Sequence, residues 1–260
     1  MHAGAQVGGG GTTCRELAEE RPVAIPYEGE FLTGSVAVPA DAAAVMLVAD
    51  DRGCSRQTAS KRGLARALRQ AGFATVMVDL LTPGEQASSE ASRLRQDAVL
   101  LALRLEAARL WVRQQPELVP LPIALLGEDG AAAAALLACA AHPHEYLSAV
   151  ACGPRPDLAG FALDLVETPV LLVAAEQEVR DIAVNRATLQ RLHGPRDLLV
   201  LPFASCSGTE ARTQLARGSS DFVLRQLRRR QSSESVYSKG LKRLRGHGAL
   251  LQRPGERRLQ

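Results

Sequence analysis

The most informative chemistry in this chain lies in residues 122–135, where Pro-Ile-Ala-Leu-Leu-Gly-Glu-Asp-Gly is followed by five alanines. A short apolar run reaches Gly127, turns and enters an alanine-rich stretch. This is the strand–turn–helix context of a nucleophile elbow, in which a strained turn raises one side chain above a parallel sheet. The raised residue is Asp129, with the small residues Gly127 and Ala131 beside it. The segment therefore predicts an elbow backbone that carries a carboxylate instead of a serine or cysteine.

Three roles for Asp129 follow from its chemistry. An ionised carboxylate can attack without losing a proton, but the resulting ester needs a histidine to activate water. The five histidines are His2, His142, His144, His193 and His247, and none lies in the segment 202–208, after the last expected strand. Asp129 can instead cap the alanine helix, since aspartate is a favoured N-cap residue. It can also bind a ligand.

Further acidic residues are expected close to Asp129. Asp50 and Asp51 follow an apolar run, and Glu128 precedes Asp129. Because the carboxyl ends of parallel strands meet at one edge of a sheet, these carboxylates should cluster there. Negative charge at this edge opposes a developing oxyanion instead of stabilising it. Arg52 and Arg56 are the cations expected to neutralise part of this charge.

The sequence provides little support for a metal or cofactor. The five cysteines are scattered and show no CxxC pairing, so neither a zinc site nor a disulfide framework is indicated. Asp50 and Asp51 could bind a cation, although carboxylates paired with arginines in a solvated loop are the simpler interpretation. Cys54 and Cys206 could be reactive thiols or small packing residues. We expect no metal site and no cofactor.

The elements that must position these residues alternate along the chain. Two strands at 23–27 and 31–38 flank Glu28-Gly29-Glu30 and predict an antiparallel hairpin. Apolar runs then predict strands at 45–49, 74–78, 123–126, 147–151, 170–174 and 198–201. Helical patterns predict helices at 58–70, 92–114, 131–141, 179–192 and 209–227. This alternation predicts an α/β protein with a mostly parallel sheet and helices on both faces.

This order of elements resembles the α/β-hydrolase fold, and within it the dienelactone-hydrolase-like proteins. The matching segments are residues 45–56, 78–83, 111–116, 122–135, 153–159 and 168–173. The resemblance implies a sheet of about eight strands. Only about eighteen residues separate Ala151 from Val170, so no lid domain is expected.

The resemblance also assigns family positions to residues of this chain. The nucleophile position falls on Asp129, the triad acid on Gln177 and the triad histidine on Cys206. The expected ligand-binding positions are Asp50, Asp51, Arg52, Gly53, Glu128 and Gly130. All three triad positions are substituted, so we expect a hydrolase-fold protein with a degenerate catalytic triad that binds a ligand or a partner. The alternative is a weak hydrolase that acts on small esters or lactones through Asp129.

Composition and charge divide the 260 residues into three regions. The chain is 46% hydrophobic but only 3% aromatic, so one aliphatic domain is expected over residues 22–228. Residues 1–21 include four consecutive glycines and predict a disordered leader. Residues 225–260 hold eleven Lys/Arg against two Glu, which leaves residues 1–224 at −6 from the overall +3. Residues 229–260 are therefore expected to form a basic, disordered tail.

The basic tail carries a second alternative function. Arg228-Arg229-Arg230 and the segment 242–245 could bind nucleic acid or an anionic membrane surface, or they could simply be solvated. The first residues show neither the basic start nor the apolar run of a signal peptide, and no apolar stretch reaches eighteen residues. We therefore expect a cytoplasmic protein with no transmembrane segment.

Overall fold

The computed structural model describes residues 18–50, 59–202 and 208–248. The fold is an eight-stranded sheet in the order β1-β2-β4-β3-β5-β6-β7-β8. The antiparallel strands are β1 (Arg21–Tyr27) and β2 (Glu30–Ala37). The parallel strands are β3 (Ala44–Asp50), β4 (Phe73–Asp79), β5 (Ile123–Glu128), β6 (Tyr146–Cys152), β7 (Val170–Ala175) and β8 (Arg196–Leu201). The predicted α/β-hydrolase architecture is confirmed, with its hairpin at one edge.

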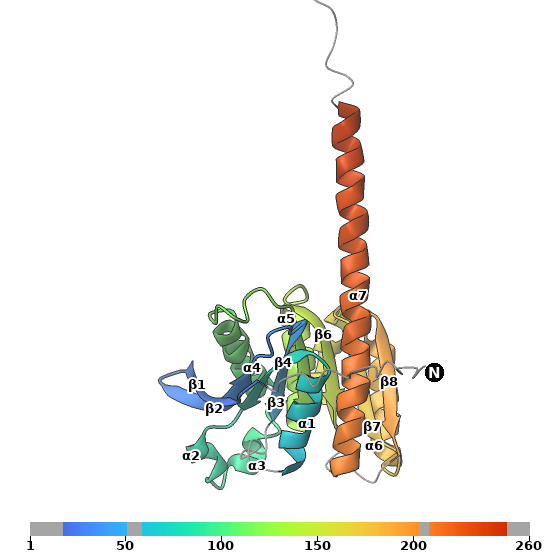
Figure 1. Ribbon diagram of the computed structural model, residues 1–260. Coiled ribbons are helices and arrows are strands. Elements are labelled where there is room, and N and C mark those ends of the chain that lie inside the picture. The colour runs from blue at the N-terminus through green and yellow to red at the C-terminus, as the bar shows by residue number, and fades with distance from the viewer. Residues whose placement is uncertain (1–17, 51–58, 203–207, 249–260) are drawn as a thin grey trace, which may run out of the picture.

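Helices cover both faces of this sheet (Figure 1). The first face carries α1 (Ala59–Gln70) and the first half of α7 (Thr209–Gly248). The second face carries α4 (Ala98–Val112), α5 (Gly130–Ala141), the 3-10 helix η2 (Pro156–Leu165) and α6 (Val179–Arg191). The short helices α2 (Pro83–Gln86) and α3 (Ala91–Leu94) connect β4 to α4. Within the described residues no lid domain is inserted between β6 and β7, as expected.

The core is aliphatic and lies in two layers, one on each side of the sheet. Every residue of β3 and β4 is buried. Along each strand, alternate side chains enter alternate layers: Val45 and Leu47 face α4 and α5, whereas Met46 and Val48 face α1 and α7. The continuous apolar runs in the sequence are the consequence of this two-sided burial.

The long helix predicted for residues 92–114 is interrupted. Asp97 caps α4 by accepting a hydrogen bond from the Leu100 amide at 3.0 Å, so a new helix begins at Ala98. The preceding α3 ends at Leu94. Aspartate disfavours a helix interior because its side chain competes for backbone donors, and here it begins a helix instead.

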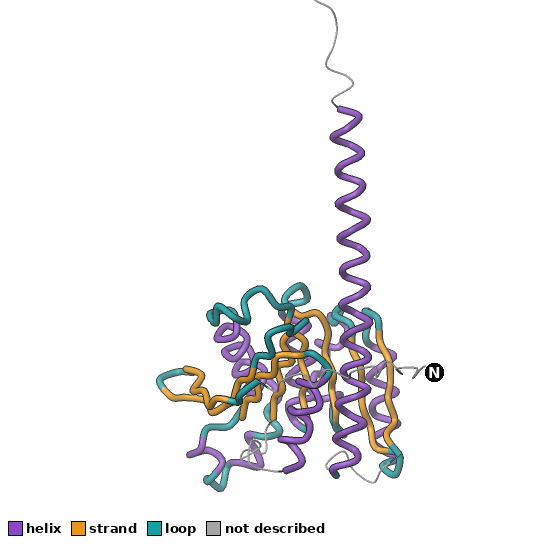
Figure 2. Tube along the Cα trace, in the orientation of Figure 1, coloured by secondary structure: helices purple, strands orange, loops and turns teal. Residues whose placement is uncertain are grey.

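The prediction of a disordered chain from residue 229 is wrong as far as Gly248. Helix α7 continues to that residue and projects from the domain (Figures 1 and 2). Its first half is nucleated by packing on the sheet, and each further residue then needs only the small free energy of helix propagation. The Ser232 and Ser233 hydroxyls donate to the carbonyls of Arg228 and Arg229, four residues earlier. The predicted leader lies outside the described residues up to residue 17, and the last twelve tail residues lie outside as well.

Candidate functional site

A strained turn joins β5 to α5 and presents Asp129. This residue has φ 54° and ψ −117°, a region that non-glycine residues rarely occupy. Its amide donates to the Cys152 carbonyl at 2.9 Å, which ties the turn to the end of β6. A Cβ on Gly127 would lie 2.2 Å from the Ala131 carbonyl oxygen, so only glycine permits this approach of strand and helix. The backbone has the small-residue geometry that the sequence predicted for an elbow.

Asp129 does not cap α5 through its side chain. It occupies the N-cap position, but its carboxylate makes no capping hydrogen bond. A capping side chain normally sits on a residue with extended backbone, from which it reaches the second or third amide of the helix. The positive φ of Asp129 gives the side chain a different direction, so the capping interpretation is wrong.

The half-buried Asp129 lines a pocket of 510 Å³ above the turn. Three segments form its walls: α3 with the turn after it, the Asp129 turn, and the connection from β6 to η2. The lining residues are Ser92, Arg95, Gln96, Asp129, Gly130, Pro154, Arg155 and Leu158. Arg155 forms two hydrogen bonds with Asp157, at 2.8 and 3.0 Å, and both raise the pKa of its guanidinium. The pocket therefore combines two arginines, one carboxylate and the amino-terminal end of α5.

A row of buried ionisable residues crosses the sheet beneath this turn. Asp79, Asp50, Glu128 and Cys152 end the neighbouring strands β4, β3, β5 and β6. Asp79 pairs in register with Asp50, and Glu128 with Cys152. By strand alternation their side chains lie on the α1 and α7 face, together with Val48 and Leu126. The predicted clustering of acidic residues is therefore present for Asp50 and Glu128, but neither lines the pocket above Asp129.

Two cations from the covering helices pair with these carboxylates. Lys61 of α1 forms an ion pair with Asp50, and Arg212 of α7 forms one with Glu128. Burial lowers the pKa of Lys61, against the opposing attraction of Glu128. Burial also acts against the charged form of Arg212, but Glu128 outweighs it and raises the pKa of that guanidinium.

The sequence analysis assigned this neutralising role to Arg52 and Arg56, which lie outside the described residues. The signal for the two cations was present in the helical patterns. Lys61 lies on the buried stripe of α1 with Leu64 and Leu68, and Arg212 precedes the buried Leu215 by three residues. A cation on an apolar stripe indicates a buried partner, but it does not identify that partner.

The other predicted site residues lie apart or outside the description. Gln177 is exposed in the turn after β7. Cys206, Asp51, Arg52 and Gly53 fall in the residues that are not described, so their roles stay predictions.

Asn185 of α6 is a residue that the sequence analysis did not single out. It is fully buried, and its amide donates to the Gly153 carbonyl at 3.1 Å and to the Asp181 carbonyl at 2.9 Å. A Cβ on Gly153 would lie 3.0 Å from the Asp129 Cα. Asn185 thus holds the segment against which the strained turn packs.

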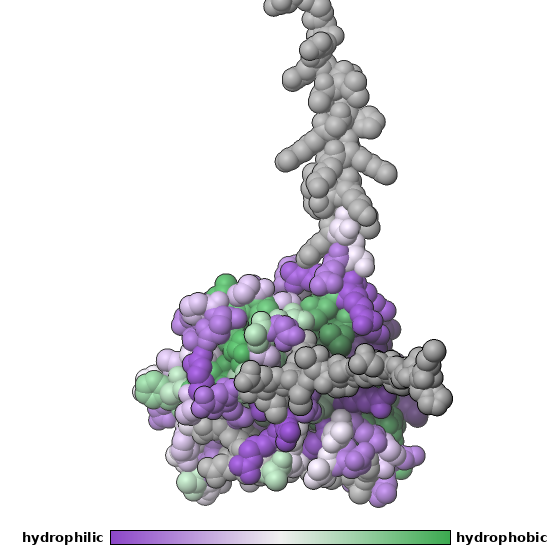
Figure 3. All heavy atoms as spheres, viewed as in Figure 1, coloured by the Kyte–Doolittle hydropathy of each residue, from purple (hydrophilic) through white to green (hydrophobic). Residues whose placement is uncertain are grey.

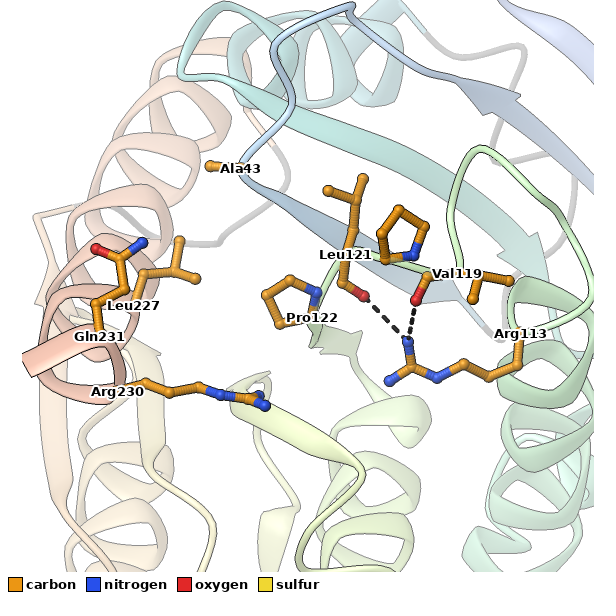
Figure 4. Close-up of a pocket in the computed structure, with 9 residues that line it drawn as sticks. Ala43, Arg113, Val119, Leu121, Pro122, Leu227, Arg230 and Gln231 are labelled. Atoms are coloured by element: carbon orange, nitrogen blue, oxygen red, sulfur yellow. Dashed lines mark hydrogen bonds between the residues drawn. The ribbon is translucent and has the colours of Figure 1, made fainter. Parts of the chain in front are cut away.

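A second pocket, of 350 Å³, lies near the amino-terminal ends of β3 and β5, where α7 leaves the domain (Figure 4). Hydrophobic residues gather at this end of the molecule (Figure 3), and Leu121, Pro122 and Leu227 line the pocket. Its Arg113 donates to the Val119 and Leu121 carbonyls at 3.3 and 3.0 Å. Arg113 therefore holds its own loop in place, and we assign no ligand to this pocket.

Comparison with known proteins places the fold among esterases and related hydrolases. The crystal structure of dienelactone hydrolase from Anabaena variabilis is 32% identical, covers 80% of this chain and 98% of its own, and superposes with a TM-score of 0.73. Est1E from Butyrivibrio proteoclasticus is 12% identical, over 79% of this chain and 98% of its own, with a TM-score of 0.64. XC6422 from Xanthomonas campestris, a serine hydrolase without a lid, is 22% identical, over 80% and 94%, with a TM-score of 0.61. The last two show the fold alone.

A curated relative from Mycobacterium tuberculosis H37Rv bears the name of a phosphoribosyl transferase. It is 34% identical over 175 residues, which is 67% of this chain. This chain spans only 39% of that relative's length. No family model matches the chain.

Among the helices of the described residues, none contains an apolar stretch long enough to span a membrane.

Proposed function

The chain belongs to the dienelactone hydrolase family of α/β-hydrolases, and we propose that it uses this scaffold to bind a small anionic molecule without hydrolysing it. The observation that carries the proposal is Asp129 at the strained turn of a pocket that also contains Arg95 and Arg155. A full negative charge at the nucleophile position opposes the negative charge that develops during acyl transfer.

The positions of the histidines also argue against hydrolysis through Asp129. His142 ends α5 and His193 follows α6, so both lie one helix length from the edge where Asp129 sits. The segment 203–207 contains no histidine in its sequence. An ester formed on Asp129 would therefore have no base in the position where this family places one.

The pocket indicates the chemistry of its ligand. Arginine guanidinium groups recognise carboxylate or phosphate, often through two parallel hydrogen bonds. The backbone amides at the start of α5 also favour negative charge. Asp129 accepts hydrogen bonds only, when it is ionised. The ligand we propose therefore has an anionic group for the arginines and a hydroxyl or amine group for Asp129.

The alternative is slow hydrolysis of small esters or lactones with Asp129 as the nucleophile. The strained backbone of Asp129 favours it, because strain of this kind stores about 1–3 kcal/mol and is typical of functional sites. The anionic-ligand proposal and this alternative predict opposite results in one assay.

We expect the purified chain to hydrolyse p-nitrophenyl acetate no faster than its Asp129→Asn variant. Release of p-nitrophenolate, followed by absorbance, measures both. The triple variant Asp129→Ser, Gln177→Asp, Cys206→His should gain activity, because it restores all three family positions on an intact turn. Turnover by the unmodified chain that Asp129→Asn abolishes would overturn the proposal in favour of the aspartate nucleophile.

Binding is tested separately by thermal shift with acetate, benzoate, succinate and inorganic phosphate. Arg95→Gln should remove the stabilisation that the best of these anions produces. Arg93→Gln is the matched control, because Arg93 lies two residues before Arg95, on α3, but pairs with Glu90 at the surface. A shift that is equal in both variants, or absent from the unmodified chain, would count against an anion site.

A second candidate function rests on α7. Residues 228–248 hold seven Lys/Arg and one Glu, on a helix that leaves an acidic domain. We expect the full chain to bind heparin with an affinity that falls steeply with salt, because polyanion binding releases counterions. A chain ending at Ser232 keeps the buried Gln226 and Leu227, so it should melt like the full chain yet lose most of this binding. Retained heparin binding or a clear drop in melting temperature would contradict this expectation.

A further inference from the structure

Three charged residues line the pocket above the Asp129 turn, and each comes from a different segment. Arg95 directly follows α3, Asp129 lies between β5 and α5, and Arg155 lies between β6 and η2. Among the residues that the structure describes, no other charged side chain lines this pocket. A ligand that matches all three residues therefore has two negative groups and one positive group.

Arg155 is oriented by a neighbour within the protein. Its Nε and Nη2 atoms donate to the two carboxylate oxygens of Asp157, at 2.8 and 3.0 Å. A guanidinium group has five N–H donors, so three remain for a carboxylate of the ligand. A side chain that is already ordered loses less conformational entropy when a ligand binds, and this favours affinity. Arg155 is therefore a suitable partner for one carboxylate, even though Asp157 offsets part of its charge.

Asp129 distinguishes between the two kinds of donor that a ligand could offer it. Its half-buried carboxylate accepts a hydrogen bond from either a hydroxyl or an ammonium group. An ammonium group also carries the opposite charge, and the attraction between two unit charges grows where a pocket lowers the effective dielectric constant. A hydroxyl group leaves the repulsion between Asp129 and the carboxylates of the ligand in place. The ammonium group therefore fits this position better.

We propose that the pocket binds a free aminodicarboxylate, which is a compact amino acid with two carboxylates and one primary ammonium group. This inference rests on the proposed function, because it names the ligand class of the same pocket. The two carboxylates bind Arg95 and Arg155, and the ammonium group binds Asp129. Pro154 and Leu158 form an apolar wall for the carbon chain. The pocket volume of 510 Å³ is typical of small-molecule sites, which span about 300–1,000 Å³.

Succinate, malate and aspartate test the proposal because they share one four-carbon dicarboxylate skeleton. They differ at a single carbon, which carries hydrogen, a hydroxyl group or an ammonium group. Isothermal titration calorimetry of the full chain at pH 7 and low salt measures the three affinities. We expect the Kd of aspartate to be at least about tenfold lower than those of malate and succinate. N-acetylaspartate has no ammonium group and should bind no better than succinate.

Asp129→Asn is the decisive variant. Asparagine has nearly the same shape as aspartate and tolerates the positive φ of this position, but it carries no charge. The variant should lose the preference for aspartate over malate and bind succinate at least as tightly as the unmodified chain. Glu90→Gln is the matched control, because it removes one negative charge from an exposed residue beside α3 and should keep the preference. Melting temperatures verify that both variants fold.

The possible outcomes separate this inference from the proposed function. Equal affinities for the three acids, all weakened by Arg95→Gln, would overturn the aminodicarboxylate and retain the anion site. Failure of all three acids to bind would overturn both. A preference for aspartate that survives Asp129→Asn would also overturn the inference, because Asp129 would then not be the group that recognises the ammonium.

Discussion

Replacing Arg212 by Met should reduce the free energy of unfolding by about 3–5 kcal/mol, because it leaves Glu128 buried without its cation. Glu128 lies at the end of the central strand β5, where little water can compensate. Urea denaturation followed by circular dichroism measures the loss. Adding Glu128→Gln to the Arg212→Met variant should recover much of it, since the uncompensated charge is then removed.

Arg93→Met provides the control for this experiment. Arg93 also pairs with a glutamate, Glu90, but both side chains are largely exposed. Surface pairs contribute at most about 1 kcal/mol, so this variant should be almost as stable as the unmodified chain. Equal losses in the Arg212 and Arg93 variants would mean that burial of the Glu128–Arg212 pair has no energetic consequence.

Gly127→Ala should destabilise the domain by about 3 kcal/mol and abolish any anion response of the pocket. The added methyl group would lie 2.2 Å from the Ala131 carbonyl oxygen and 2.7 Å from its carbon. Both atoms belong to the backbone, so no side-chain rotation can relieve the contact, and α5 must move away from β5. The Asp129 turn would move with it. Thermal and urea denaturation, together with the thermal-shift assay, measure these effects.

Gly63→Ala is the matched control for the glycine substitution. Gly63 lies inside α1, and no atom comes within 4 Å of a Cβ placed on it. Alanine is about 1 kcal/mol more favourable than glycine in a helix, so this variant should be more stable than the unmodified chain. A neutral Gly127→Ala would show that strand β5 and helix α5 are not as tightly packed as the structure indicates.

The strands were predictable because burial on both sides gives each one a continuous apolar run. The strands expected at 45–49, 123–126 and 170–174 coincide with β3, β5 and β7 to within a residue or two. The hairpin was predictable from Glu28-Gly29-Glu30, and Glu28 and Gly29 do adopt the positive φ of a tight turn. The extent of α7 was not predictable from the sequence. Each of its glycines lowers the helix propensity, but the half of the helix that packs on the sheet nucleates the helix and stabilises its continuation.

The candidate site was predictable only where one segment forms it. The Asp129 turn follows from neighbouring small residues, which a single stretch of sequence displays. The pocket above it needs Arg95 and Arg155, which come from different connections, and the Glu128–Arg212 pair joins residues 84 positions apart. Periodicity describes one element at a time, so it cannot identify partners that only the sheet brings together.

The position of α7 along the chain has a consequence for the order of folding. All eight strands precede this helix, but Leu215, Phe222 and Val223 cover one side of the sheet that those strands form. While the chain is being synthesised, the part of that apolar side that α7 covers stays exposed, and Glu128 lacks its partner Arg212 until α7 has left the ribosome. Chains emerge at about 5–20 residues per second, and exposed apolar surface favours aggregation. Stable folding of the whole sheet therefore waits until α7 has been synthesised.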